Sequence, residues 1–456
     1  MTQPTRTGAA GTLDPSFADK GVLTFPTPEI SGFYTEAVLA LPNKKILLGM
    51  TLSGGVGQPT VVARLNEDGS LDTGFGGNGS GLVEINIDIE VPRLDVRQFC
   101  VLSEGDWLVM GGYFTPTSNG LYLVKYCEDG QVEESFGVKG VLVLPFADMG
   151  NPADVGVGGE VPGPGDEELS TGTTRVSASK GAAALQQLDG KILLVSSHTT
   201  ESEREQGILL RLNSDGSTDY TFNGVGFVYV ELEGIDYEYN VAEVVAVQAD
   251  GKILVGGHFR LAGQNERGVY VTRFDAMGRL DRSFNGGTVT VRHSSLTYLK
   301  AIEIREADGS IVAVGEALRD VVRNGMIFVL SRDGFFDFSF NRGQPLFSLL
   351  VPQGLRWQCC ALQKDGSIIV AGTTGNAFAT DGAKALTARF FSDSSLDPTF
   401  NGTGFTVFNE DETHNEFLQD MTMMSDGRIV GCGLTRVAKG SASDIEGAGW
   451  VIRYLA

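Results

Sequence analysis

A short motif recurs seven times along this chain and limits the folds that the chain can adopt. The motif is a turn, an acidic residue and, three residues later, a phenylalanine, as in "DGSLDTGF" at residues 68–75. Successive phenylalanines stand 58, 61, 86, 62, 56 and 60 residues apart. Such a period predicts that one structural unit is copied along the chain. The seven phenylalanines are Phe17, Phe75, Phe136, Phe222, Phe284, Phe340 and Phe400.

Each unit contains four short segments with the composition of β-strands. In one unit they are "VVAVQ" (244–248), "KILVGG" (252–257), "VYVTRF" (269–274) and "GTVTV" (287–291). Turn residues bound these segments, and no comparable stretch has sustained helical periodicity. Sheets of four strands repeated seven times predict an all-β fold, a seven-bladed β-propeller of four-stranded blades.

The two ends of the chain complement each other in this arrangement. The last repeat stops at "WVIRYLA" (450–456) without a fourth strand, whereas the chain opens with a motif that no strands precede. We therefore expect residues 11–26 to supply the outer strand that closes the last blade, which would remove free sheet edges. The predicted organisation is an N-terminal tail, 1–10, followed by a single propeller, 11–456.

The repeated acidic residues have two interpretations. They could bind calcium, but one acid per turn is too few for a cage of six to eight oxygens. We favour a structural role, in which the carboxylate holds the turn and the phenylalanine packs between neighbouring blades. The five cysteines lack the spacing of a zinc site or a disulfide framework. We expect neither a metal nor another cofactor.

The repeats resemble a known family, the delta-60 repeat of bacterial proteins. Units of that family carry the same "DGSLD-x-x-F-G" and "DGKI-x-x-x-G" signatures, and the resemblance extends from about residue 11 to 456. Two repeats depart from the pattern, with Glu133 in place of the aspartate and "DSS" (393–395) in place of Asp-Gly. The resemblance implies a propeller fold and supplies no catalytic residue set.

Charge and hydropathy narrow the possible partners. The chain has 35 Lys and Arg against 57 Asp and Glu, a formal net charge of −22. Such acidity disfavours nucleic acid and anionic membranes as partners. The sequence contains no apolar run of the ~18 residues that a membrane span needs. Without a recognisable signal peptide, we expect a cytoplasmic monomer, with non-classical export left open.

Strand order predicts that the long loops share one face of the ring. The short Asp-Gly turns lie on the other face. The longest loop, 147–179, is rich in acidic residues, glycine and proline. It is either a tolerated insertion or a functional flap or docking arm.

Aromatic residues recur where the chain enters the inner strands on the long-loop face. They could stack on a sugar or hold a peptide side chain at the channel mouth, or they could pack between blades. The four histidines are predicted on loops of the same face, and His258 with Arg260 would be an acid/base candidate if the protein were an enzyme. The aromatic candidates for ligand binding are Tyr34, Tyr239, Tyr298, Trp357 and Phe417.

No motif of a known catalytic class occurs in the sequence. The leading hypothesis is a non-catalytic propeller that recognises a protein or peptide through its long-loop face. The alternatives are a carbohydrate-binding propeller and an enzyme with a site at the channel mouth. A protein binder should expose a contiguous apolar patch on that face. An enzyme should gather titratable groups with shifted pKa values there.

Overall fold

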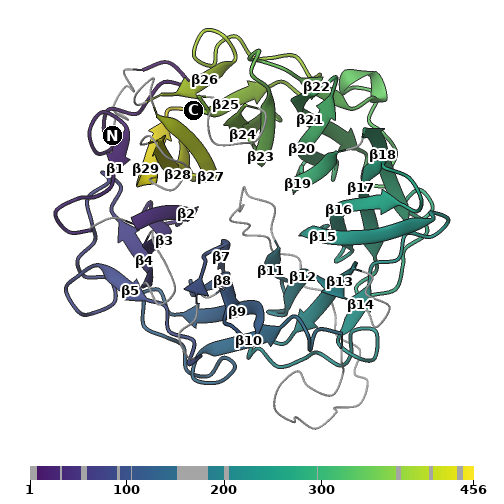
Figure 1. The fold of residues 1–456 in the computed structure, drawn as a ribbon, viewed down its shortest axis with the longest axis horizontal. Coiled ribbons are helices and arrows are strands. Elements are labelled where there is room, and N and C mark those ends of the chain that lie inside the picture. The colour runs from purple at the N-terminus through teal and green to yellow at the C-terminus, as the bar shows by residue number, and fades with distance from the viewer. Residues whose placement is uncertain are drawn as a thin grey trace.

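Seven antiparallel sheets surround a central channel in the computed structural model (Figure 1). This arrangement confirms the predicted all-β propeller of seven blades. The structure describes residues 8–30, 33–52, 59–89, 93–103, 105–150, 183–199, 205–294, 296–375, 382–409, 414–438 and 445–456. Most of the 147–179 insertion therefore lies outside the described residues.

In blades 1 to 6 the strands follow the chain from the channel outwards. Blade 1 contains β2 (Phe33–Ala40), β3 (Ile46–Leu52), β4 (Thr60–Leu65) and β5 (Leu82–Glu84). Blade 2 contains β6 (Arg93–Leu94), β7 (Gln98–Val101), β8 (Trp107–Phe114), β9 (Asn119–Tyr126) and β10 (Val141–Pro145). Blade 3 contains β11 (Ala184–Gln186), β12 (Ile192–Thr199), β13 (Glu205–Leu212) and β14 (Phe227–Tyr229). Blade 4 contains β15 (Tyr237–Val247), β16 (Ile253–Leu261), β17 (Arg267–Phe274) and β18 (Thr288–Ser294).

The remaining three blades complete the ring. Blade 5 contains β19 (Thr297–Ile304), β20 (Ile311–Arg319), β21 (Val322–Leu330) and β22 (Leu346–Ser348). Blade 6 contains β23 (Leu355–Leu362), β24 (Ile368–Thr374), β25 (Ala385–Phe390) and β26 (Phe405–Phe408). Blade 7 contains β27 (Asn415–Met423), β28 (Ile429–Ala438), β29 (Ile445–Tyr454) and β1 (Val22–Thr24). In this last sheet, Val22 lies opposite Ile452.

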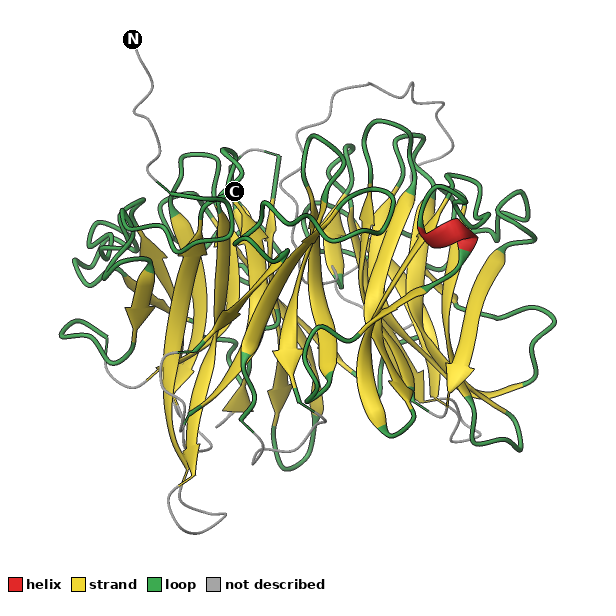
Figure 2. Cartoon of the chain, turned by 90° about the horizontal axis from the view of Figure 1, so that it is seen from above, coloured by secondary structure: helices red, strands yellow, loops and turns green. Residues whose placement is uncertain are grey.

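The strands cross the ring from one face to the other, as Figure 2 shows. The short turns stand on the face that also carries η1 (Asn341–Gly343), a single turn of 3-10 helix. Within the described ranges, no helix is both long and apolar enough to cross a membrane.

The hydrophobic core is divided among the seven interfaces between blades. Each interface holds one cluster of buried side chains from two neighbouring sheets. Between blades 4 and 5, for example, Leu254 and Phe284 pack with Leu299 and Phe328. Burial of apolar surface therefore holds each blade to the next, and the ring has no single central core.

The repeated acid and phenylalanine belong to a three-residue set that joins neighbouring blades. In blade 4, Nε of Arg273 donates to Oδ2 of Asp281 at 2.9 Å, and its guanidinium lies 4.7 Å from the centre of the Phe284 ring. The other oxygen of Asp281 accepts hydrogen bonds from the backbone N–H and hydroxyl of Ser283. Arg273 also donates from Nη1 to the carbonyl of Arg332 in the next blade, at 2.7 Å. We call this set the Arg–Asp–Phe triplet.

The triplet recurs in five of the seven blades. Blade 2 has Lys125 and Glu133 at the first two positions, and blade 5 has Val329 in place of the arginine. The acids thus hold turns and the phenylalanines pack between blades, as predicted from the motif. The other four triplets are Arg64–Asp72–Phe75, Arg211–Asp219–Phe222, Arg389–Asp397–Phe400 and Arg453–Asp14–Phe17.

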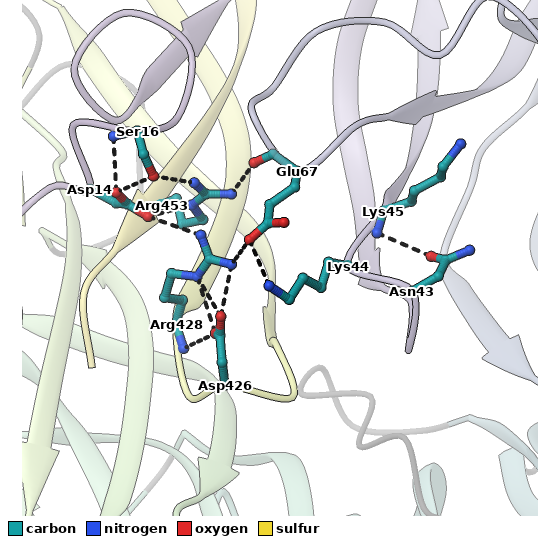
Figure 3. Close-up of polar contacts among 9 residues, drawn as sticks. All are labelled: Asp14, Ser16, Asn43, Lys44, Lys45, Glu67, Asp426, Arg428 and Arg453. Atoms are coloured by element: carbon teal, nitrogen blue, oxygen red, sulfur yellow. Dashed lines mark hydrogen bonds and ion pairs between the residues drawn. The ribbon is translucent and has the colours of Figure 1, made fainter. Parts of the chain in front are cut away.

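Residues from both ends of the chain meet where blade 7 adjoins blade 1 (Figure 3). Arg453 of β29 donates from Nε to Oδ2 of Asp14 at 2.8 Å, and Nη1 of Arg428 lies 3.3 Å from the same oxygen. Nη2 of Arg428 also donates to Oε1 of Glu67 in blade 1, at 2.5 Å. Arg453 also donates to the carbonyl of Glu67. An ionic network with Asp14, Arg428 and Arg453 buried and Glu67 exposed thus connects the N-terminal segment, the last strand and blade 1.

Candidate functional site

An irregularity in the inner strand of each of five blades determines which side chains face the channel. In five blades the register between the first and second strands shifts by one residue, which marks a β-bulge. A bulge re-aims a side chain and is common beside functional sites. The bulged residues are Glu36, Glu243, Lys300, Gln358 and Gln419.

A cavity of about 900 Å³ occupies the channel and opens to solvent. Four of the five bulged residues line it, all except Glu36. Cations and carboxylates are both present on its wall, and they come from several blades. The cations are Arg97, Lys300 and Arg356, and the carboxylates are Glu205, Glu243 and Glu316.

One group of charged side chains lies where blades 4 and 5 meet the cavity. Oε1 of Glu243 is 3.1 Å from Nζ of Lys300, and Oε2 is 3.4 Å from Nδ1 of His258. Burial raises the pKa of Glu243, but the charge of Lys300 and the contact with His258 outweigh it, and the net shift is downward. Glu243 is therefore a carboxylate at neutral pH, with a basic side chain near each of its two oxygens.

Two tyrosines flank His258 on the long-loop side of this group. The ring of Tyr298 meets the imidazole edge to face at 4.9 Å between centroids, and Tyr239 does so at 6.2 Å. Arg267 donates from Nη1 to the hydroxyl of Tyr298. Its guanidinium lies 5.4 Å from the Tyr298 ring centre and 5.9 Å from that of Tyr239. We call Tyr239, Glu243, His258, Arg267, Tyr298 and Lys300 the blade 4–5 cluster.

A second charged group lies where blades 5 and 6 meet the same cavity. Nη1 of Arg323 is 2.6 Å from Oε2 of Glu316. Arg356 of β23 lines the cavity beside them, and its buried Nε has no hydrogen-bond partner. Burial lowers the pKa of Arg356, and the charge of Glu316 opposes that effect while Arg323 adds to it.

The five predicted aromatic residues occupy four different environments. Only Tyr239 and Tyr298 come together, in the blade 4–5 cluster. Tyr34 lies against Gly447 of the neighbouring blade, and Phe417 lies beneath the guanidinium of Arg436 at 5.6 Å. Trp357 is fully buried in the core between blades 5 and 6, where Nε1 donates to Oγ of Ser348 at 2.9 Å.

The number of residues between each aromatic residue and the bulged residue of its strand explains these differences. Tyr34, Tyr298 and Phe417 all stand two residues before a bulged residue, where side chains are half-buried at the mouth. Trp357 stands only one residue before its bulge, at the position where Leu299 of blade 5 is also fully buried. Because neighbouring residues of a strand face opposite sides, one step turns Trp357 into the core. Arg356 takes the mouth position in blade 6.

His258 and Arg260, which the sequence suggested as an acid/base pair, each contact a different carboxylate. His258 contacts Glu243, whereas Nε of Arg260 lies 3.3 Å from Oε2 of Glu238. The prediction that all four histidines lie on loops is wrong, because the β-hairpins extend further than the strand pattern indicated. His198 lies in β12, His258 in β16 and His293 in β18. Over the ranges that the structure describes, no three His, Cys, Asp or Glu side chains are grouped to hold a metal ion.

Exposed apolar side chains concentrate on the short-turn face. On described segments of the long-loop face, the large exposed ones are Phe114, Val321 and Leu349. These come from blades 2 and 5 and form no patch that spans the mouth. The short-turn segments expose Val132, Val138, Leu188, Tyr220, Met277, Phe335, Phe338 and Phe391.

Comparisons with known proteins agree with the fold. Residues 41–75, 187–222, 248–284 and 363–400 match the model of a β-propeller described as a domain of unknown function, DUF5122. These matches and the ring of seven sheets support a β-propeller repeat family. A comparison with curated proteins gives no match.

Solved structures with low similarity include proteins of different kinds. A PL25 ulvan lyase bound to -[GlcA(1-4)Rha3S]- is 11% identical, with 93% of this chain and 95% of that chain covered and a TM-score of 0.48. The Dos1 propeller is 11% identical, with 95% and 94% covered and a TM-score of 0.44. An acylaminoacyl peptidase of Pyrococcus horikoshii is 8% identical, with 90% and 52% covered and a TM-score of 0.42. Likeness at this level does not indicate what this chain binds.

Proposed function

We propose that this protein is a non-catalytic binding propeller that takes a peptide segment into the channel mouth on the long-loop side. One observation carries the proposal: charged and polar side chains of blades 4, 5 and 6, among them Glu243, Lys300 and Arg356, line a single cavity of about 900 Å³, and the ring of Tyr298 lies beside Lys300 at its wall. Ligand sites typically have volumes of roughly 300–1,000 Å³ and a few well-placed polar groups. The cavity meets both criteria.

The chemistry of the cavity favours a peptide over a neutral sugar. A sugar stacks on a free aromatic face, but the ring of Tyr298 already has Arg267 and the ammonium of Lys300 within 5.4 Å and 5.3 Å of its centre. A peptide offers N–H donors, carbonyl acceptors and charges of both signs. The wall supplies complementary groups, including Glu243, Lys300 and Gln358.

The state of Glu243 supports binding rather than acid catalysis. A general acid at neutral pH needs a raised pKa, so that it still carries a proton to donate. The pKa of Glu243 is lowered instead, and Lys300 and His258 contact its two oxygens. In our proposal this carboxylate orients Lys300 and His258 at the cavity wall.

The distribution of apolar surface supports a peptide segment rather than a globular partner. A protein interface has a contiguous apolar centre. The described long-loop segments expose only separated apolar side chains, such as Phe114 and Val321. An extended segment that enters a polar channel needs no such patch.

A binding array tests the proposal. Peptides of defined sequence, with free and with amidated C-termini, are printed beside neutral and acidic oligosaccharides and probed with wild type and with Tyr239→Ala/Tyr298→Ala. Tyr220→Ala is the control, because Tyr220 is a partly exposed tyrosine on the opposite face. We expect peptides to bind wild type and the control, and the double variant to lose most of that binding.

Two outcomes would overturn the proposal. Binding of oligosaccharides alone would establish the carbohydrate-binding alternative. Peptide binding that the double variant retains in full would place the site elsewhere on the molecule.

A further inference from the structure

We infer that Arg356 is the receptor for a carboxylate of the ligand. The inference rests on the proposed function and names the chemistry that the cavity recognises. Arg356 is half-buried on β23 and lines the cavity, and the buried Nε of its side chain has no hydrogen-bond partner among the residues that the structure describes. By contrast, the buried arginine of each Arg–Asp–Phe triplet, such as Arg273, has an aspartate partner.

Two of the three carboxylates of the wall have basic partners of their own, and the third, Glu205, stands on β13 of blade 3 and not beside blade 6. The nearest candidate, Glu316, contacts Arg323 at 2.6 Å. Glu243, further along the wall, is held by Lys300 and His258. Arg323 and Arg356 therefore both lie near Glu316, whose single negative charge can compensate only one of them.

The guanidinium suits a carboxylate in shape as well as in charge. Arginine stays protonated in proteins, and its planar fork offers parallel N–H groups that match the two oxygens of a carboxylate. Arg356 also takes the mouth position of its blade, which Tyr298 takes in blade 5. A ligand that contacts Tyr298 would thus meet the next blade at Arg356.

An unpaired cation makes a second, independent prediction. A charge that is partly buried without a partner lowers the stability of the folded protein. Proteins retain such a cost where the residue is needed for binding. Arg356→Gln should therefore leave the melting temperature of the free protein unchanged or raise it. A structural arginine would show the opposite, because its removal would lower the melting temperature.

Thermal shift with three small probes tests the inference at constant ionic strength. The probes are acetyl-Gly-Gly with a free carboxylate, its C-terminal amide, and acetyl-Glu-amide, whose carboxylate is on the side chain. We expect at least one carboxylate probe, but not the Gly-Gly amide, to raise the melting temperature of wild type. Arg356→Gln should weaken that binding by about tenfold to a hundredfold, because hydrogen bonds to a charged group are lost.

Two further variants sharpen the result. Arg356→Lys keeps the positive charge but lacks the planar, forked guanidinium. Its affinity for the carboxylate probes should therefore lie between those of wild type and Arg356→Gln. Arg279→Gln is the matched control, since Arg279 is 75% exposed on the short-turn face. It should respond as wild type does. The two carboxylate probes separate a C-terminal carboxylate from an acidic side chain as the group that Arg356 receives.

Contrary results fall into two separable classes. Equal shifts with the amide, equal shifts in Arg356→Gln, or a lowered melting temperature of Arg356→Gln would overturn the inference. If array peptides bind at the channel mouth while neither carboxylate probe acts, the carboxylate assignment fails and the proposed function stands. If nothing binds in either experiment, both fail.

Discussion

Arg453 donates a hydrogen bond from Nε to Oδ2 of Asp14 across 2.8 Å, joining residues that are 439 positions apart. Both side chains are buried, and Arg428 contacts the same carboxylate. The pair has the geometry of the Arg–Asp–Phe triplets, but its two members come from opposite ends of the chain. It therefore couples the last blade to the N-terminal segment.

Removal of this carboxylate should destabilise the ring. Asp14→Ala leaves two buried guanidinium groups without it, and breaking a buried ion pair costs about 3–5 kcal/mol. Asp393→Ala, in an exposed turn where the carboxylate accepts hydrogen bonds from Ser395, should cost about 1 kcal/mol or less. Urea denaturation of the two variants measures the difference. Equal losses would show that the Asp14 contact does not hold the ring together.

The contact between a turn glycine and the phenylalanine of the preceding blade should be measurable with a matched pair. Gly334 has a φ of +86°, and a Cβ there would stand 2.9 Å from the ring of Phe284. Gly251 has a φ of +79° with nothing within 4 Å. Both Gly→Ala changes incur the left-handed penalty of about 1–2 kcal/mol. Only Gly334→Ala should add about 1–3 kcal/mol for the clash.

Denaturation midpoints in urea test this second prediction. The excess cost of Gly334→Ala over Gly251→Ala reports how rigidly blade 5 is seated on blade 4. If the two variants lose the same free energy of unfolding, the phenylalanine must move aside without cost, and the interface is looser than its packing indicates.

Acid should weaken the propeller through the aspartates of the triplets. Burial opposes ionisation of Asp281, but hydrogen bonds from Ser283 and Lys252 and the charge of Arg273 outweigh it and lower its pKa. Because the folded pKa lies below the unfolded value of 3.8, the stabilisation is complete above that value. It is lost as pH falls below about 4 towards the folded pKa. The same direction holds for Asp14, Asp72, Asp219 and Asp397.

Stability measured at a series of pH values checks this sign. The free energy of unfolding should fall steeply below about pH 4, and Asp281→Asn should show a shallower fall because it lacks one of the titrating groups. A decline that begins near pH 6 instead would assign the acid sensitivity to histidines.

Trp357 should matter for stability and not for binding. Trp357→Phe removes its hydrogen bond to Ser348 while most of the ring volume stays, at a cost of about 1 kcal/mol. Trp357 borders the cavity, but its side chain is fully buried, so ligand affinity should not change. Thermal unfolding and peptide titration of this variant test both statements. A large loss of ligand affinity without loss of stability would show instead that Trp357 takes part in ligand binding.

The fold could be predicted because its determinants are local and repeated. The acid and the phenylalanine stand at fixed spacing in every repeat, with a glycine three residues before the acid in six of the seven, and their contacts with the neighbouring blade follow from that spacing. The arginine of the triplet lies at the end of the third strand, eight residues before its aspartate in blade 4. A basic residue is visible there in most repeats, but sequence alone does not show that it reaches the next blade.

The residues that the structure gathers in the candidate site were predicted only in part, for a reason that lies in the backbone. Tyr239 and Tyr298 were predicted, and they meet because they lie near the entries of neighbouring blades. Glu243, Lys300 and Arg356 were not predicted, because a β-bulge breaks the alternation from which a side chain's direction is inferred. For the same reason Trp357, one position out of register, was grouped with the mouth residues.

The most direct test of the channel mouth as a binding site is to measure the dissociation constant of a peptide for wild type and for variants of that mouth. Isothermal titration of the tightest array peptide would compare wild type, Tyr239→Ala/Tyr298→Ala and Tyr220→Ala. We predict that the double variant binds at least tenfold more weakly, a loss of about 1.4 kcal/mol, while Tyr220→Ala binds as wild type does. Equal affinity of wild type and the double variant would contradict the assignment of the ligand site to the channel mouth.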